Sequence, residues 1–227
     1  MNMTIKLLDL FCCAGGAGMG YSRAGFDVVG VDINPQPRYP FEFHQADALD
    51  YLAKHGNEFD AIHASPPCQA FSAMKHMPDA KKHPELIDDT REILETLDVP
   101  WVIENVVGAP LKDSVILCGS MFNLTAAGFG LQRHRQFESN INLTTPGPCS
   151  HTLPTIGIYG GHVRCRSTKF WRDSGADFPG YNKKQLAYDA MGIDHEMTMN
   201  ELSEAIPPAY TEHIGRQLMA QLVGVAA

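Results

Sequence analysis

Residues 7–20 read Leu-Leu-Asp-Leu-Phe-Cys-Cys-Ala-Gly-Gly-Ala-Gly-Met-Gly, and this stretch decides the fold of the chain. Its first five residues predict a short apolar strand, and its glycines predict a tight turn that leads into a helix. Glycines let the backbone approach a ligand closely, and a helix N-terminus offers unpaired N–H groups. The order strand, glycine-rich turn, helix is typical of nucleotide-binding α/β folds, and alone it fits any such site.

The pattern continues along the chain. Apolar strands are predicted at residues 27–32, 59–64 and 101–106, and a helix with one apolar face is predicted at residues 84–98. Alternating strands and helices indicate an α/β layer fold. Asp32 ends the second strand, where a carboxylate is well placed to accept hydrogen bonds from a ribose diol. A single acid at a strand end is about as often a solvated surface residue.

A proline-stiffened loop follows the strand at 59–64. Residues 65–72 read Ser-Pro-Pro-Cys-Gln-Ala-Phe-Ser. Each proline fixes its own φ, and Pro67 also pushes Pro66 away from helical geometry. Cys68 is therefore expected in an ordered, non-helical turn at a strand end, which suits a nucleophile better than a core residue.

This octapeptide resembles the active-site segment of the cytosine-C5 DNA methyltransferases, in which the cysteine attacks C6 of a cytosine ring. Residues 104–106, Glu-Asn-Val, resemble a second family segment, whose glutamate contacts N3 of the cytosine. Residues 133–135 resemble the family's Arg-x-Arg pair, whose members brace the active loop and hold the cytosine O2. The resemblance implies the catalytic residues Cys68, Glu104, Arg133 and Arg135. It also implies that the substrate is bound by Pro67, Gln69, Ser72 and Asn105.

The same resemblance implies S-adenosyl-L-methionine as the cofactor. The implied fold is Rossmann-like, with a mostly parallel sheet, helices on both faces and a small variable insert. The family usually has glycine where Cys13 stands, so Cys13 would be strained if the turn needs a positive φ there. Glu204 replaces the usual Asn of the last family segment, at residues 203–208. The cofactor-binding residues carried over are Phe11, Cys13, Gly15, Gly16, Asp32, Ile33, Asp47, Ala48 and Pro66.

Charge is unevenly distributed. The 227-residue chain has a formal net charge of −8, whereas residues 133–184 hold eight basic and three acidic residues. Basic residues interleaved with aromatic ones suit phosphate contact and base stacking, although a solvated basic loop has the same composition. We expect Arg164, Arg166 and Lys169 to bind DNA. The expected division is a catalytic domain of residues 1–137 and 198–227 and a target-recognition insert of residues 138–197. So short an insert predicts a short or degenerate recognition sequence.

The six cysteines are expected to be reduced thiols. Cys149-x-His151 and His162-x-x-Cys165 could together hold zinc. The first spacing is tighter than usual, so ordinary loop residues are favoured and no metal is expected. No signal peptide or long apolar run is evident in the sequence, which predicts a cytoplasmic protein without membrane contact.

The expected activity is methylation of C5 of cytosine in DNA by a monomer, through a covalent Cys68–C6 adduct on a flipped-out base. The compact form resembles enzymes carried by phages, within the restriction-modification class. The same chemistry on tRNA or on a free cytosine nucleotide is one alternative, although the Cys-Phe-Thr signature of the tRNA-acting branch is absent from the sequence. A catalytically silent cofactor- or DNA-binding protein is the other.

Overall fold

A seven-stranded sheet forms the centre of the protein. The computed structural model describes residues 4–67, 85–165, 178 and 180–224. The first five strands in the sheet order pair in parallel, and the last two pair antiparallel. The predicted mostly parallel α/β fold is therefore confirmed. The sheet order is β3 (Glu42–Gln45), β2 (Asp27–Asp32), β1 (Lys6–Leu10), β4 (Ala61–Ala64), β5 (Trp101–Asn105), β9 (Arg135–Ser139) and β6 (Val115–Leu117).

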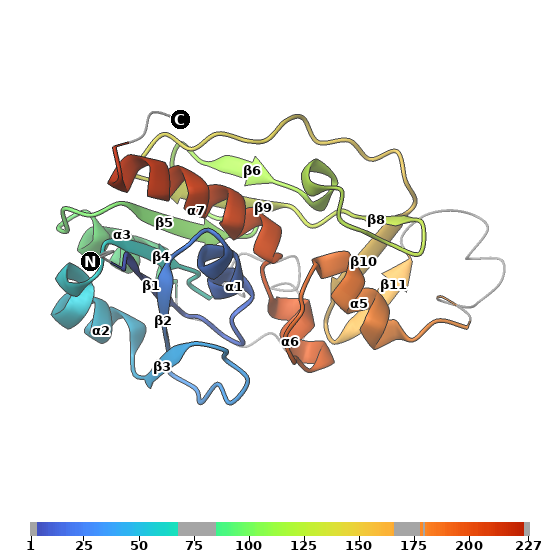
Figure 1. Ribbon diagram of the computed structural model, residues 1–227, viewed down its shortest axis with the longest axis horizontal. Coiled ribbons are helices and arrows are strands. Elements are labelled where there is room, and N and C mark those ends of the chain that lie inside the picture. Colours follow the sequence, from blue (N-terminus) through green and yellow to red (C-terminus); the bar gives the residue numbers. More distant parts are fainter. Residues whose placement is uncertain (1–3, 68–84, 166–177, 179, 225–227) are drawn as a thin grey trace.

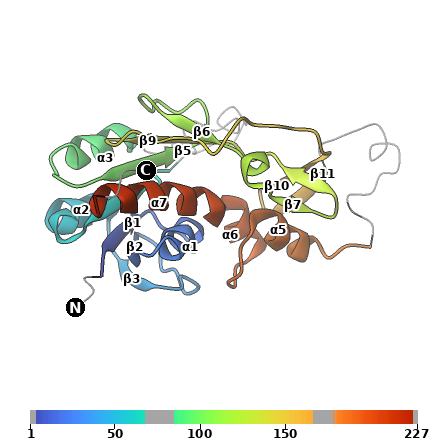
Figure 2. The same ribbon diagram turned by 45° about the horizontal axis from the view of Figure 1, so that its top comes forward.

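Helices cover both faces of this sheet (Figures 1 and 2). Side chains alternate between the two faces of a strand. In β1, Leu7 packs into the core under helices α1 (Gly16–Arg23) and α7 (Pro208–Leu222). Leu8 and Leu10 pack into the core on the other face, under α2 (Ala48–His55) and α3 (Ile87–Leu94). The apolar run of β1 is thus explained by burial on both sides.

A smaller sheet and two helices make a second lobe beside the first (Figure 1). Its strands enclose an apolar core of their own, which includes Ile156, Ile158 and Leu186. The lobe contains β7 (Thr125–Ala126), β8 (Phe129–Leu131), β10 (Thr155–Tyr159), β11 (His162–Cys165), α5 (Lys183–Met191) and α6 (Met199–Glu204). Short 3₁₀ helices occur at η1 (Gly56–Glu58) and η3 (Gly119–Phe122).

The second lobe takes strands from both sides of the expected boundary at residue 138. Strands β7 and β8 precede that boundary, and β8 pairs in parallel with β10, which follows it. The division into a catalytic domain and a recognition insert remains a prediction, and strand pairing adds residues 125–131 to the small lobe.

The helix expected at residues 84–98 is shorter in the structure. Helix α3 spans Ile87–Leu94, and its chain continues through turns in which Thr96 N bonds Ile93 O and Leu97 N bonds Leu94 O. These tighter i→i+3 bonds end the regular helix before Pro100. Within the described ranges, no helix is both long and apolar enough to cross a membrane.

Gly20 tests the contact between α1 and α7. A Cβ at Gly20 would lie 2.1 Å from Thr211 Oγ1 and 2.2 Å from the Pro208 carbonyl oxygen. Gly20→Ala should lower the free energy of unfolding by about 1–3 kcal/mol, because overpacking outweighs the gain of about 1 kcal/mol in helix propensity. Urea unfolding measures this change.

Gly130→Ala is the matched control, because its new Cβ would lie 3.4 Å from Leu153 Cβ, an ordinary contact. Equal unfolding midpoints for Gly20→Ala and the wild-type chain would contradict the tight packing of α1 on α7.

Candidate functional site

A cavity of about 450 Å³ opens at the carboxyl edge of the parallel strands. Its walls come from the turn after β1 and the start of α1, the end of β2, the loop after β4, the end of β5, the start of β9, and the end of α6 with the residues that follow it. Ligands of α/β folds bind outside the carboxyl ends of the strands. Among the residues expected from the sequence, the lining includes Phe11, Cys13, Gly16, Asp32, Ile33, Pro66, Pro67, Glu104 and Arg135.

The glycine-rich turn is held by the end of β2. Cys13 has a φ of 45°, so the strain considered for this position is present. Asp32 offsets part of it, because Asp32 Oδ2 accepts the Cys13 N–H at 3.1 Å and Oδ1 accepts the Asn34 N–H at 2.9 Å. Gly15, the N-cap of α1, has a φ of 86°. A side chain at Gly15 would be strained and would meet Pro40 Cδ at 2.8 Å.

The loop after β4 is anchored at two points. Ser65 donates its N–H to the Leu10 carbonyl at 3.2 Å, and Asn105 Nδ2 donates to the Pro66 carbonyl at 2.9 Å. The ends of β1 and β5 therefore fix the prolines that line the cavity. Cys68, Gln69 and Ser72 lie outside the described residues.

Glu104 and Arg135 form an ion pair at the base of the cavity. Glu104 is buried, and its Oε1 lies 3.0 Å from Arg135 Nε. The pair lacks hydrogen-bond geometry, and Oε1 has no hydrogen-bond partner among the described residues. Burial raises the pKa of Glu104, while Arg135, Arg133 and a hydrogen bond from Ser65 oppose the rise. Glu104 therefore holds a proton more readily than an exposed glutamate does.

Behind Glu104, a buried chain of hydrogen bonds reaches helix α1. His63 Nε2 lies 2.8 Å from Ser65 Oγ, and His63 Nδ1 lies 2.9 Å from the Tyr21 hydroxyl. Burial lowers the pKa of His63 to about 3, so the ring is neutral and donates through one nitrogen only. With Ser65 donating to Glu104, the chain is consistent when Tyr21 donates to His63 and His63 donates to Ser65.

Arg133 connects the two lobes and lies outside the cavity lining. Its guanidinium donates to the carbonyls of Ile158 in β10, at 2.9 Å, and Ser203 in α6, at 2.7 Å. Its own carbonyl accepts the Tyr210 hydroxyl at 2.6 Å. Of the two arginines, Arg135 faces Glu104, and Arg133 braces the joint between the lobes.

Three expected cofactor residues are not part of the cavity lining, and one of them is Gly15, the N-cap of α1. Asp47 is the N-cap of α2, and its Oδ1 accepts the N–H groups of Leu49 and Asp50 at 3.0 Å each. Asp47 and the buried Ala48 do not line the described cavity. Helix capping occupies Oδ1 of Asp47, and a cofactor contact by this residue stays a prediction.

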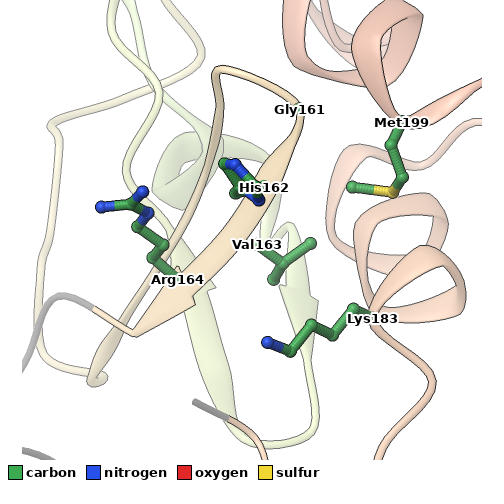
Figure 3. A pocket seen from close by; sticks show the side chains of 6 residues that line it. All are labelled: Gly161, His162, Val163, Arg164, Lys183 and Met199. Atoms are coloured by element: carbon green, nitrogen blue, oxygen red, sulfur yellow. The ribbon is translucent and has the colours of Figure 1, made fainter.

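Three basic residues are expected to bind DNA, and of these only Arg164 lies among the residues that the structure describes. It is exposed on β11, and its Cζ lies 5.6 Å from the centre of the Tyr159 ring. In Figure 3, Arg164 extends from the side of β11 opposite Val163, while Lys183 and Met199 lie across the hollow from that strand. This hollow has a volume of about 280 Å³. Arg166 and Lys169 lie outside the described residues.

Two residues of the site, Asp9 and His63, were missed in the sequence. Asp9 lines the cavity together with Ser203 and Glu204 of the last family segment, and His63 supports it from behind. Polar residues inside apolar strands, Asp9 in β1 and His63 in β4, were the available signal. Both are buried, which is uncommon for such residues unless they are hydrogen-bonded.

Comparison with known proteins now decides the family. The family model for C-5 cytosine-specific DNA methylase matches residues 5–123, more than half of the chain. The chain belongs to the C-5 cytosine-specific DNA methylase family. The match spans the glycine turn, Asp32, the segment from Ser65 and Glu104, which build most of the cavity, while the lining residues Arg135 and 203–206 lie outside it.

Two of the curated relatives are longer than this chain. The chain is 30% identical over 122 residues to the type II methyltransferase M.HgiDI of Herpetosiphon aurantiacus. The aligned region covers 48% of this chain and 39% of the relative. The chain is 26% identical over 162 residues to M.AgeI of Thalassovita gelatinovora, covering 58% of this chain and 38% of the relative. The chain thus spans about two fifths of the length of these two relatives.

Solved structures agree on the fold. The Schizosaccharomyces pombe Dnmt2 methyltransferase matches with a TM-score of 0.61 and 14% identity, over 97% of this chain and 99% of that one. The Entamoeba histolytica methyltransferase EhMeth matches with a TM-score of 0.56 and 13% identity, over 97% and 99% of the two chains. At such identity, these likenesses support the fold of the chain alone.

Asp9 should make stability depend on pH. Burial raises its pKa to about 7, with Asp32 adding to the rise and the Tyr39 hydroxyl opposing it. The folded state therefore holds a proton that the unfolded chain releases above about pH 4, so stability falls as the pH rises towards 7. Asp9→Asn cannot lose that proton. The melting temperature of this variant should rise relative to that of the wild-type chain as the pH goes from about 5 to 8.

Thermal melts at several pH values measure the difference. Asp27→Asn is the control, because Asp27 is exposed at the start of β2. A difference between Asp9→Asn and wild type that stays constant over this pH range would contradict the assignment.

Proposed function

We propose that this chain transfers a methyl group from S-adenosyl-L-methionine to C5 of a cytosine in DNA, through a covalent bond between Cys68 and C6. The cavity is the observation that carries the proposal. It joins the glycine turn and Asp32 at one end to Pro67, Glu104 and Arg135 at the other. Cys68 follows Pro67 directly in the chain. A cofactor and a flipped base would therefore share one recess.

The residues present fit the cofactor. The cavity volume of about 450 Å³ lies in the usual range of small-molecule sites, about 300–1,000 Å³. The N-terminus of α1 offers N–H groups to a carboxylate, and buried Asp32 has lone pairs left for a ribose diol. Ile33 is 65% exposed at the rim, where it offers apolar surface to a purine. When bound, S-adenosyl-L-methionine supplies an electrophilic methyl group.

The target cytosine has to leave the base stack before reaction, because C5 and C6 are inaccessible inside a duplex. Cys68 then adds to C6 as a thiolate, which is the reactive form of a cysteine. Cys12 is a poor substitute, because burial and the charges of Asp9 and Asp32 raise the pKa of its thiol. After methyl transfer, a water or a basic side chain accepts the C5 proton, the C5–H electrons form the C5–C6 double bond, and the bond from C6 to Cys68 breaks, which restores the ring and frees the thiolate.

Glu104 is suited to assist at N3. Addition of the thiolate pushes electron density onto the cytosine ring, and proton donation at N3 lowers that barrier. A buried carboxyl with a raised pKa keeps the proton that this step needs. The chain from Tyr21 through His63 to Ser65 orients the carboxyl from behind. Arg135 holds Glu104 in place and donates to O2 of the base.

The small lobe is the proposed recognition part. Arg164 and Lys183 place positive charge around its hollow, and the basic residues Arg166 and Lys169 belong to the same segment of sequence. Such groups contact phosphates, and nearby aromatic side chains stack on bases. Arg133 would position this lobe against the cavity by its bonds to β10 and α6.

Cys68→Ala should abolish methylation while leaving cofactor binding intact, because the variant lacks only the nucleophile. Bisulfite sequencing of plasmid DNA from expressing cells measures methylation, and the bases that flank each methylated cytosine give the recognition sequence. Calorimetric titration of S-adenosyl-L-methionine is the control for folding. Methylated cytosines at wild-type levels in Cys68→Ala would overturn the covalent mechanism. A wild-type chain that binds cofactor but leaves DNA unmodified would overturn DNA as the substrate.

Glu104→Gln should lower kcat/KM by about 10²–10⁴-fold, the usual contribution of acid–base assistance, because an amide cannot donate a proton to N3. Wild-type activity should also fall as the pH rises through the raised pKa of Glu104, and the variant should lack that fall. Tritium transfer to DNA over a range of pH measures both effects. Glu92→Gln, at an exposed position of α3, is the control. An unchanged alkaline limb in Glu104→Gln would exclude Glu104 as the acid.

A further inference from the structure

Two cysteines and two histidines meet where the two lobes join. Cys118, His134, Cys149 and His151 each offer one ligand atom, and these four atoms all lie within 4.8 Å of one another. Cys118 directly follows β6, and His134 lies between β8 and β9. Cys149 and His151 lie in the long segment from β9 to β10, which crosses the top of Figure 1 in yellow. Four separate positions in the chain thus converge on one point.

The distances are close to those of a tetrahedral metal site. With Zn–S of about 2.3 Å and Zn–N of about 2.0–2.1 Å, a tetrahedron puts sulfur and nitrogen ligands about 3.6 Å apart. Cys118 Sγ lies 3.4 Å from His151 Nε2, and Cys149 Sγ lies 3.4 Å from His134 Nε2. Cys149 Sγ and His151 Nε2 are closer, at 2.7 Å. Their separation would grow by about 1 Å on binding. Cys149 is exposed, so its segment has room to move.

The chemistry of the donors selects the ion. Two thiolates and two imidazoles in a tetrahedron are typical of zinc, whereas calcium and magnesium require oxygen ligands. Both cysteines are free thiols in the structure. Ser120 Oγ lies 3.5 Å from Cys118 Sγ and 3.3 Å from Cys149 Sγ. At these distances its hydroxyl can donate a hydrogen bond to a metal-bound thiolate.

We propose that Cys118, His134, Cys149 and His151 bind one structural Zn²⁺ ion. Four protein ligands close the coordination sphere, so the ion has no position for a reacting water. Its effect is to fasten the segment from β9 to β10, which has no helix or strand of its own, onto the end of β6. The ligand His134 stands between Arg133 and Arg135, so the ion would also fix the two arginines. The proposal does not depend on methyl transfer.

The sequence spacing considered for zinc, Cys149-x-His151 with His162-x-x-Cys165, therefore contains two of the four proposed ligands. Cys149 and His151 are in the cluster, but His162 is exposed at the start of β11 and is not a member. Cys118 lies 31 positions before Cys149 and shows no short spacing to a second ligand. Only the pairing of β6 with β9 brings it to the others.

Metal content is the first test. The full chain, expressed without a polyhistidine tag and purified without chelator, should contain one equivalent of zinc by plasma mass spectrometry. Cys149→Ser and His151→Ala should each lose most of that zinc. His162→Ala is the matched control and should keep it. Full retention of zinc by both ligand variants would overturn the assignment, and so would a disulfide between Cys118 and Cys149 in the native protein.

Cobalt gives a readout that is independent of variant folding. Wild-type protein stripped by a chelator, with its thiols reduced, is titrated with Co²⁺ alone, and circular dichroism checks that it remains folded. Tetrahedral cobalt with thiolate ligands should give intense visible d–d bands and a near-ultraviolet sulfur-to-metal band, both lost on adding one equivalent of Zn²⁺. Folded, reduced protein that gives neither band would overturn the proposal. Chelator should also lower the melting temperature of the wild type more than that of Cys149→Ser.

Discussion

The alternation of side chains in three parallel strands is the constraint on which the site depends. In β1, β4 and β5, the residues that follow Leu7, Ala61 and Val102 by two positions are Asp9, His63 and Glu104. Leu7, Ala61 and Val102 all belong to the core under α1 and α7, so the three polar residues face the same side near the strand ends. A shift by one residue in β4 or β5 would move its polar side chain to the opposite face, under α2 and α3. The strand register therefore sets the chemistry of the cavity.

That arrangement places a titratable group in an apolar setting, and its neighbours make this tolerable. An isolated buried carboxylate is costly, which is why burial raises the pKa of Glu104. Arg135 supplies charge on one side, and the neutral chain through Ser65 and His63 supplies a fixed dipole on the other. The two supports leave Oε1 without a hydrogen bond among the described residues. A ring nitrogen placed at that oxygen would complete its partners, so the unsatisfied atom fits a substrate contact.

Local sequence could predict the strands and turns of the site, because each depends on a few consecutive residues. The glycine turn, Asp32, the prolines and Glu104 were found in this way, and the structure brings them to one cavity. Other features depend on pairing between distant segments. Asp47 was carried over from the family resemblance as a cofactor residue, and its cap of α2 is a second role that the resemblance did not include. The bonds of Arg133 and the approach of Cys118 and His134 to Cys149 are set by how the lobes meet, and no short spacing encodes them.

Residues 133–135 concentrate these long-range effects in one short segment. Arg133 reaches the carbonyls of β10 and α6, His134 points to the cysteine–histidine cluster, and Arg135 pairs with Glu104. Since β9 begins at Arg135 and pairs with both β5 and β6, the segment cannot shift without moving the edge of the central sheet. A displacement of the small lobe would therefore move Arg133 through its hydrogen bonds to β10 and α6, and would move Arg135 with it. This physical connection gives the chain a direct route by which the position of the proposed recognition lobe could affect the geometry around Glu104.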